Sequence, residues 1–426
     1  MARIFVSLGP LRRPLIGAVA CLGLAAAAPA AAAPRKLPPL PRHWPSHRLE
    51  LGLANQPGFA ASLRRAAPFG FRYQYLAGGS NTGAGWSTWN PNGTFVSRYI
   101  RESAKQHITP VFTYYMLRQS APGNGVGDER QADLGNLDDA ATMQSLLADL
   151  KLFFQRAGAT HRAVVLHLEP DLWGFGEQAA GGGGASNVKA LVSAAGMPEL
   201  SGLPDTLAGF AQAVKRLRDR YAPRALLAYQ LSVWGTGVDI QYSDPPPDQV
   251  RALGRKAAAF YRSLHTHFDL TFSEFSDRDA GYKEKVNGDG GASWWKAADF
   301  ARNVRFLSTY SHAARQRVVM WQIPLGNTEM RAENNTTGHY QDNRVQWLLG
   351  SQRAKHLKAY RNAGVIAFLF GDGAAGTTCA CDAQHDGITN PPAIDGNNRL
   401  SLSSDDDGGL FHELASRFYK HKRLKL

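Results

Sequence analysis

Cysteine is scarce in this sequence, and its scarcity excludes several kinds of protein. Only three of the 426 residues are cysteines, and Cys21 lies in an N-terminal segment that we expect to be removed. Cys379 and Cys381 are separated by one residue, so a bond between them would close a tight ring. A disulfide framework is therefore excluded, and a cysteine metal site lacks a second pair of ligands. The pair offers at most a local bond in an oxidising compartment.

Charged residues are also few, and only one long hydrophobic run is present. Asp, Glu, Lys and Arg make up 19% of the chain and hydrophobic residues 44%, which excludes a largely disordered or coiled-coil protein. The apolar run spans residues 14–28, follows three arginines and ends in small residues, as a secretory signal peptide does. It is too short for a membrane anchor. We expect a signal peptide over residues 1–33 and a secreted or periplasmic protein without a membrane span.

Basic residues outnumber acidic ones. Lys and Arg total 48 against 35 Asp and Glu, which gives a net charge of +13, and part of this excess lies in residues 421–426. Such a tail either remains solvated or meets the anionic polysaccharides of a cell envelope. For an exported protein we do not expect a nucleic-acid partner.

Strand-like and helix-like segments alternate along the rest of the chain. Short apolar runs rich in β-branched and aromatic residues are typical of strands buried on both faces. Between them, apolar residues recur every three or four positions, as in Met143, Leu147 and Phe154, which predicts amphipathic helices. The expected strands are 49–54, 71–76, 109–115, 163–168, 225–234, 269–275, 318–323 and 365–370. The expected helices lie near 96–106, 143–154, 207–217, 248–264, 295–310, 343–362 and 410–419.

Eight strand-to-helix alternations predict an α/β fold, a single (β/α)8 TIM barrel. A doubly wound open sheet is the alternative, because a sequence does not show whether its sheet closes. We expect residues 48–420 to form the barrel, residues 34–47 a Pro-rich linker and residues 421–426 a basic tail. Three Gly- and Asp-rich insertions follow expected strands, which places them at the C-terminal face where barrels carry their sites. They span residues 123–138, 174–202 and 371–404.

Three ionisable residues alternate at the end of the fourth expected strand. His167, Glu169 and Asp171 fall on one face, because side chains of a strand alternate with a period of two. Barrel interiors are normally filled by branched apolar side chains, so polar residues there need compensation. They form either a functional site or a buried polar network that fixes the strand end. We favour a site, because barrels draw catalytic groups from the C-terminal ends of strands.

A second acidic group closes the sixth expected strand. Glu274 has the position of a partner carboxylate, and Asp277 follows it closely. The alternative for Asp277 is a solvated loop in which it pairs with Arg278. Two carboxylates are what glycosidic cleavage needs: one acid protonates the leaving oxygen, and the other attacks the anomeric carbon or activates water. We expect Glu169 as the acid/base, and Asp171 or Glu274 as nucleophile, base or electrostatic stabiliser.

Aromatic and amide side chains recur at the expected strand ends. Sugar rings stack on aromatic side chains, and neighbouring polar groups bind their hydroxyls. Each aromatic residue alone fits a core position, and the polar residues fit turns, but their recurrence favours a ligand site. The expected substrate-binding residues are His167, Trp86, Trp89, Tyr114, Trp173, Trp234, Trp321, Gln322, Asn327 and His339.

With these residues the chain resembles the (β/α)8-barrel glycoside hydrolases. The resemblance covers nearly the whole mature length as a pattern, and its motif is the run from His167 through Glu169 to Asp171. In the clan typified by cellulases and mannanases, the acid/base is a Glu on strand four, which Glu169 matches. That clan places its nucleophile Glu at the end of strand seven, where this chain has Gln322. The acidic strand-four run of chitinase-like barrels is only partly present. The resemblance thus implies a glycoside hydrolase that cleaves a polysaccharide or oligosaccharide, and no specific family.

Two other functions fit the same residues. A metal-dependent phosphodiesterase-type barrel would use His167, Glu169 and Asp171 as ligands of Mg²⁺ or Ca²⁺, although the first strand lacks the His-Arg-Gly opening of glycerophosphodiesterases. A non-catalytic carbohydrate-binding barrel would explain the missing carboxylate on strand seven. For the favoured glycosidase we expect a carbohydrate substrate as partner, no cofactor, no metal and a monomeric state.

Overall fold

The computed structural model describes residues 36–329, 340–371, 377–378 and 407–426. Residues 37–426 belong to one compact unit. The expected signal peptide, His339, and the Cys379 and Cys381 pair lie outside the described residues, as does nearly all of the expected insertion 371–404.

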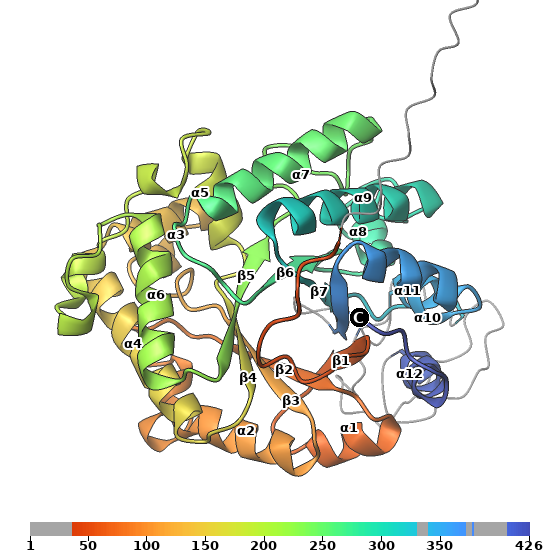
Figure 1. Ribbon diagram of the computed structural model, residues 1–426, viewed down its shortest axis with the longest axis horizontal. Helices are drawn as coiled ribbons and strands as arrows, with labels where there is room; N and C mark the ends of the chain where they lie inside the picture. Colours follow the sequence, from red (N-terminus) through yellow and green to blue (C-terminus); the bar gives the residue numbers. More distant parts are fainter. Residues whose placement is uncertain (1–35, 330–339, 372–376, 379–406) are drawn as a thin grey trace, which may run out of the picture. The chain divides into compact units, whose positions relative to one another are not determined.

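Eight parallel strands form a closed barrel in which each strand pairs with its neighbour in sequence, and β8 pairs with β1 (Figure 1). The predicted (β/α)8 barrel is therefore confirmed and the open sheet is excluded. The strands are β1 Glu50–Ala54, β2 Phe71–Leu76, β3 Thr109–Tyr114, β4 Val164–Leu168, β5 Ala225–Leu231, β6 Leu270–Glu274, β7 Val318–Ile323 and β8 Val365–Phe370.

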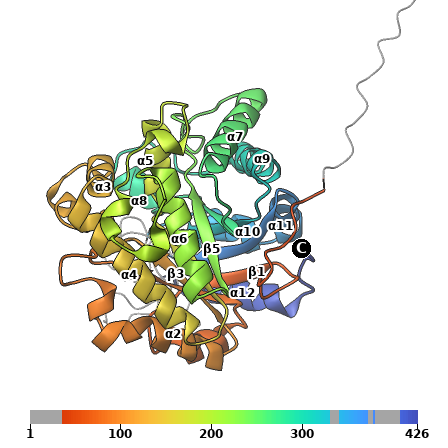
Figure 2. The same ribbon diagram turned by 60° about the vertical axis from the view of Figure 1, so that its left-hand side comes forward.

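Helices surround the strands, and Figures 1 and 2 both show α4 and α6 side by side on the outside of the barrel. Side chains of Asp128, Asp139 and Thr206 accept hydrogen bonds from the first turns of α3, α4 and α6, which fixes where these helices begin. The helices are α1 Ala60–Ala66, α2 Thr94–Lys105, α3 Glu129–Leu137, α4 Ala140–Gly158, α5 Leu172–Ala179, α6 Leu207–Tyr221, α7 Pro247–Arg262, α8 Ala280–Lys285, α9 Ala297–Ala314, α10 Arg344–Leu349, α11 Arg353–Asn362 and α12 Leu410–Lys420.

Two hydrophobic layers hold the barrel. One lies between strands and helices, and the other fills the barrel interior with inward-facing side chains such as Val165, Leu226 and Val319. The predicted helix 343–362 is two helices, because Gly350 interrupts it with an extended backbone. Short helices α3 and α5 lie in segments that the Gly and Asp content predicts as loops. α3 forms because Asp128 caps it and because it packs against α4 and α5.

The described parts of the expected linker and tail, residues 36–47 and 421–426, pack against the barrel. Trp44 stacks on Phe71 with ring centroids 4.8 Å apart, and Leu40 and Leu426 pack against the same interior cluster. The backbone N–H of Leu426 donates to the carbonyl of His47 at 3.0 Å. These apolar side chains cover the N-terminal end of the barrel interior, which would otherwise face water.

Replacing Trp44 by Ala is expected to lower the free energy of unfolding by about 3 kcal/mol, because a large ring leaves a packed interior. Trp44 is 8% exposed, whereas Trp89 is 39% exposed, so Trp89→Ala serves as the matched control. We expect the control to cost less than about 1 kcal/mol. Urea denaturation followed by circular dichroism measures both values. Equal costs for the two variants would show that residues 37–47 behave as a linker.

Candidate active site

A cavity of about 390 Å³ opens at the C-terminal ends of the strands. Its wall combines carboxylates with aromatic rings, which is the composition that a carbohydrate site needs. The carboxylates are Glu129, Asp171, Asp239, Glu274 and Asp277. The aromatic residues are Tyr75, Tyr115, Phe175, Trp234, Tyr242 and Trp321. Lys283 and Gln322 also line this cavity, which we call the pocket.

Asp171 reaches the pocket because the chain turns sharply at the end of β4. Glu169 has a positive φ of 42°, a conformation that side chains other than glycine rarely adopt. This turn ends the strand alternation and places Asp171 on the pocket wall, half-buried. Burial, and then the negative charges of Glu129 and Asp277, raise the pKa of Asp171 to about 7. Asp171 can thus exchange a proton near neutral pH.

A chain of hydrogen bonds crosses four strands and ends at Glu274. Thr113 Oγ1 lies 3.3 Å from His167 Nδ1, and His167 Nε2 lies 3.0 Å from Gln230 Oε1. Gln230 Nε2 donates to Glu274 Oε2 at 3.0 Å. Burial lowers the pKa of His167 to about 3, so its ring is neutral and donates through Nε2 to Gln230. The chain therefore fixes the orientation of the Glu274 carboxyl group.

Glu274 retains its proton more strongly than Asp171 does. Burial raises the pKa of Glu274 well above its usual value, and the negative charge of Asp171 raises it further. Two carboxylates that repel each other lose the first proton more easily than the second. The pair therefore favours a state in which Asp171 is ionised and Glu274 is protonated.

Asp277 has the opposite electrostatic environment. Burial alone would raise its pKa, but the positive charges of Lys283 and Arg278 lower the pKa below its usual value. Lys283 Nζ lies 2.9 Å from Asp277 Oδ1, and Arg278 pairs with Oδ2. Asp277 is therefore an ionised partner of Lys283 on the pocket wall.

Glu169, the expected acid/base, is buried below the pocket wall and does not line the pocket. Its side chain is 2% exposed, and Oε1 accepts backbone N–H groups of Met116 at 3.2 Å and Leu117 at 3.0 Å. Burial raises the pKa of Glu169 to about 8, although these two hydrogen bonds lower it. The carboxyl group holds the loop that follows β3, and the pocket-lining pair is Asp171 and Glu274.

The Glu169→Gln variant is expected to lose less stability than the native chain as the pH rises into the alkaline range. The pKa of Glu169 is about 8 in the folded chain against a usual value of 4.5, so folding retains its proton between these values. Its contribution is complete below pH 4.5 and disappears as the pH rises through 8. Gln keeps an acceptor oxygen for both N–H groups and does not ionise. Between pH 5 and pH 9, the variant should lose on the order of 2 kcal/mol less stability than the native chain.

Urea unfolding at several pH values tests this expectation. Asp248→Asn is the matched control, because it also removes one carboxylate and the Asp248 side chain is 93% exposed. The control should follow the pH dependence of the native chain. Parallel curves for the Glu169 variant and the native chain would contradict the buried, protonated state of Glu169.

Three of the expected substrate-binding residues line the pocket: Trp234, Trp321 and Gln322. His167 lies beneath the pocket, with its ring centroid 4.6 Å from that of Trp321, and takes part in the hydrogen-bond chain. Trp89 packs against Phe95 outside the pocket. Asn327 is buried and donates to the carbonyl of Asp407 at 2.8 Å.

Trp86, Tyr114 and Trp173 lie in the layer between strands and helices and not at the pocket. Trp86 Nε1 and the Tyr114 hydroxyl both donate to Asp149 of α4, at 2.6 and 2.7 Å. Trp173 donates to the carbonyl of Leu168 at 2.8 Å. All three are fully buried. Tyr114 is in β3, whereas Trp86 and Trp173 lie in helical segments that follow strands. Composition alone did not distinguish aromatic residues of the core from aromatic residues of the pocket.

Several pocket residues have no signal in the sequence. Glu129 comes from α3, where it accepts the Tyr115 hydroxyl at 2.5 Å. Asp239 lies in the long connection after β5, and Lys283 lies in the short helix α8. Tyr75 ends β2 and accepts a hydrogen bond from Gln322 Nε2 at 3.0 Å. Only the fold brings these positions together.

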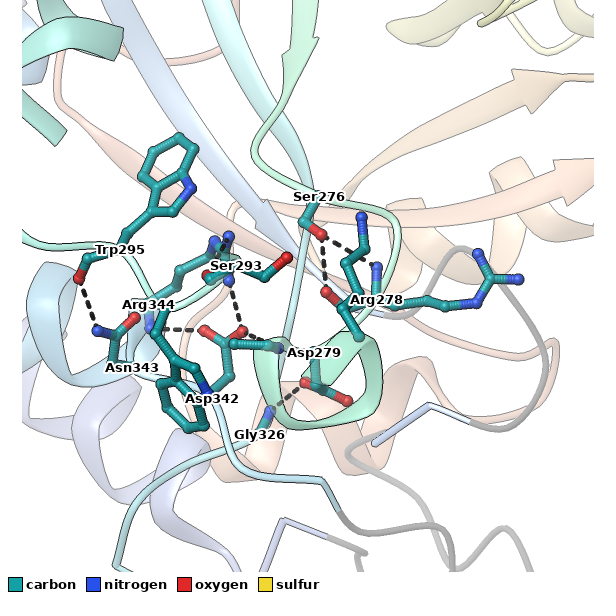
Figure 3. Close-up of polar contacts among 12 residues, drawn as sticks. Ser276, Arg278, Asp279, Ser293, Trp295, Gly326, Asp342, Asn343 and Arg344 are labelled. Atoms are coloured by element: carbon teal, nitrogen blue, oxygen red, sulfur yellow. Dashed lines mark hydrogen bonds and ion pairs between the residues drawn. The ribbon is translucent and has the colours of Figure 1, made fainter. Parts of the chain in front are cut away.

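Two buried aspartates join the loops that border the pocket (Figure 3). Asp279 accepts backbone N–H groups of Gly326 at 2.8 Å and Thr378 at 2.9 Å. Asp342 accepts those of Ala280 at 2.8 Å and Arg344 at 2.7 Å. Burial, and then the negative charge of Asp342, raise the pKa of Asp279 to about 8. The loop that carries Asp277 is therefore fixed to the loops that follow β7 and β8.

The described part of the chain contains neither a group of metal-ligating side chains nor a helix suited to span a membrane. Across the described ranges 36–329, 340–371, 377–378 and 407–426, no three His, Cys, Asp or Glu side chains are grouped so that they could hold a metal ion. None of the helices in the part of the chain that the structure describes has the length and apolar character to cross a membrane.

No protein-family model and no curated protein sequence matches the chain. Solved structures of glycoside hydrolases are similar to it in fold. A modular endo-β-1,4-mannanase of family 26 from Cellulomonas fimi aligns over 88% of this chain and 71% of its own, with 11% identity and a TM-score of 0.49.

The catalytic domain of a family 26 endo-β-1,4-mannanase from Bacillus sp. JAMB-750 aligns over 88% of this chain and 86% of its own, with 10% identity and a TM-score of 0.46. A β-glucosidase from Exiguobacterium marinum aligns over 74% of this chain and 76% of its own, with 11% identity and a TM-score of 0.40. These similarities concern the barrel fold, and an activity has to be argued from the pocket.

Proposed function

We propose that this protein is a glycoside hydrolase that cleaves a polysaccharide or oligosaccharide in the pocket, with Asp171 and Glu274 as its two catalytic carboxylates. The observation that carries the proposal is that these two carboxylates share one pocket. Both line one aromatic-walled cavity, and the charge of Asp171 raises the pKa of Glu274. A pair that contains one acid and one carboxylate is the requirement of glycosidic cleavage.

Glu274 acts as the general acid in this mechanism. Gln230 donates to Oε2, so Oε2 is the acceptor oxygen and the proton is carried on Oε1. From there it passes to the glycosidic oxygen as the bond to the leaving sugar breaks. The His167 ring holds the Gln230 amide in the orientation that this arrangement needs.

Asp171 acts as the carboxylate, either by attacking the anomeric carbon or by activating water. Gln322, which donates to Tyr75, lies where the cellulase and mannanase clan has its nucleophile. Because an amide cannot serve as that carboxylate, the role falls to another residue of the pocket, and Asp171 lines it. Asp277 is less suited to the role, since its charge is neutralised by Lys283 and Arg278. The aromatic walls, among them Trp234 and Trp321, provide faces on which sugar rings stack.

The proposal includes export through the signal peptide expected over residues 1–33, and action as a monomer outside the cytoplasm. N-terminal sequencing of the mature protein tests the first statement, and light scattering tests the second. A mature chain that begins at Met1, or a stable dimer, would contradict them.

The experiment that tests the activity is the release of reducing ends from a panel of bacterial and plant glycans. We expect cleavage of at least one member, no cleavage by Glu274→Gln, and no effect of a chelator. Loss of activity with a chelator would favour the metal-dependent phosphodiesterase alternative. Binding without turnover by the native protein would favour the non-catalytic carbohydrate-binding barrel, for which the amide at Gln322 is the supporting observation.

A further inference from the structure

The pocket has a charge opposite to that of the whole chain. The sequence carries a net charge of +13, yet among the described residues five carboxylates and one lysine line the pocket. The ammonium group of that residue, Lys283, lies 2.9 Å from Asp277. A ligand therefore meets negative charge here, although the protein as a whole attracts anions.

Two of these carboxylates have no role in the proposed chemistry. Glu129 accepts the Tyr115 hydroxyl at 2.5 Å, and Asp239 accepts the backbone N–H of Gln241 at 2.7 Å. Neither forms an ion pair with a residue in the described part of the chain. Their charges oppose ionisation of the catalytic pair: Glu129 raises the pKa of Asp171, and Asp239 raises that of Glu274. Glu129 thus places negative charge beside the pair, and Asp239 adds to it, although Lys283 and Arg302 partly offset the charge of Asp239.

The pocket already contains one arrangement that recognises an ammonium group. Lys283 Nζ lies 5.1 Å from the centre of the Tyr242 ring and contacts both its hydroxyl group and Asp277. A carboxylate beside an aromatic ring is a favourable environment for a cation. Glu129 beside Tyr115 repeats this pairing, with no ammonium group from the described chain.

A donor on the wall adds an independent sign of a ligand. Trp321 lines the pocket, is 1% exposed, and its indole Nε1–H has no hydrogen-bond partner among the described residues. Buried N–H groups are normally paired, so an acceptor such as a sugar hydroxyl suits this one.

We infer that the substrate is a glycan with free amino groups, a polymer or oligomer of unacetylated hexosamine, whose ammonium groups bind Glu129 and Asp239. The inference rests on the proposed glycosidase function and names its substrate class. An acidic glycan such as a polyuronate would be repelled by the negative charge of the pocket. A neutral glycan would leave Glu129 without a charged partner among the described residues, in a partly buried site.

Binding is measured by calorimetry with the Glu274→Gln protein, which holds the substrate without turnover. The probes are short oligomers of glucosamine and of galactosamine, their fully N-acetylated counterparts of equal length, and cello- and manno-oligomers. We expect the free-amine oligomers to bind at least about tenfold more tightly than the acetylated ones, and added salt to weaken that binding.

Adding Glu129→Gln or Asp239→Asn should each weaken free-amine binding by about tenfold and leave neutral oligomers unaffected. Asp248→Asn, which removes an exposed carboxylate on α7, is the matched control and should change neither affinity. Equal or tighter binding of acetylated or neutral oligomers would overturn the inference. So would unchanged free-amine binding in both charge variants.

Turnover by the native protein separates this inference from the proposed function. Cleavage of a neutral glycan, with no binding of free-amine oligomers, would retain the glycosidase and overturn the substrate class. Charge-dependent binding of free-amine oligomers without cleavage would retain the ligand class and overturn the catalytic proposal. Cleavage of free-amine oligomers that stops with Glu274→Gln would support both.

Discussion

Glu274→Gln is expected to lower kcat for a natural glycan by about 10³-fold, because the amide has no proton to give to the leaving oxygen. The fold should be unaffected, since the amide retains an acceptor oxygen for Gln230. Melting temperature and circular dichroism check the fold, and reducing-end release measures kcat.

Comparing a natural glycan with a substrate that has a better leaving group tests whether Glu274 acts as an acid or has only a structural role. An aryl glycoside with a strongly acidic phenol leaves without protonation, so the variant should cleave it with a loss of about tenfold or less. Gln230→Leu removes the hydrogen bond but leaves the carboxyl group, and it serves as the comparison. We expect it to retain part of its activity on both substrates. Equal losses on the natural and the aryl substrate would contradict the acid role of Glu274.

The strands could be predicted from the sequence because each is buried on both faces. Their β-branched and aromatic content gave the bounds of β2, β7 and β8 without error, and Gly350 shows why one predicted helix was too long. Closure could not be predicted, since it depends on pairing between β8 and β1, which are far apart in the chain. The packing of residues 36–47 and 421–426 could not be predicted for the same reason. Their few apolar side chains meet the barrel interior only in the folded protein.

The site was predictable where one strand carries it. The period of two brought His167 to the barrel interior, and the position at the end of β6 indicated Glu274. The period of two placed both Glu169 and Asp171 at the site, but the positive φ at Glu169, which has no sequence signature, leaves only Asp171 on the pocket wall. Glu129 and Asp239 come from a helix and a loop that the pattern describes only as connections. Their approach to Asp171 and Glu274 is a property of the tertiary structure.

Asp171→Asn is expected to lower kcat by about 10³-fold or more, and to do so on natural and aryl glycosides alike. Attack on the anomeric carbon, or activation of water, is needed whatever leaves, so a good leaving group does not rescue the variant. This equality distinguishes Asp171 from Glu274. A loss confined to the natural substrate would exchange the two roles.

The pH dependence of kcat/KM for the native enzyme should reflect the ionisation of Asp171. The pKa of Asp171 is about 7, so kcat/KM should fall as the pH decreases below 7 and Asp171 gains a proton. The groups that face it are Glu129 on α3, Glu274 at the end of β6 and Asp277 in the following loop. Glu129→Gln removes a negative neighbour, which favours ionisation of Asp171 and should shift this acidic limb to lower pH. Asp248→Asn should leave the limb in place. A limb that does not move in the Glu129 variant would show that another group controls it, and the assignment of Asp171 as the ionised partner would fail.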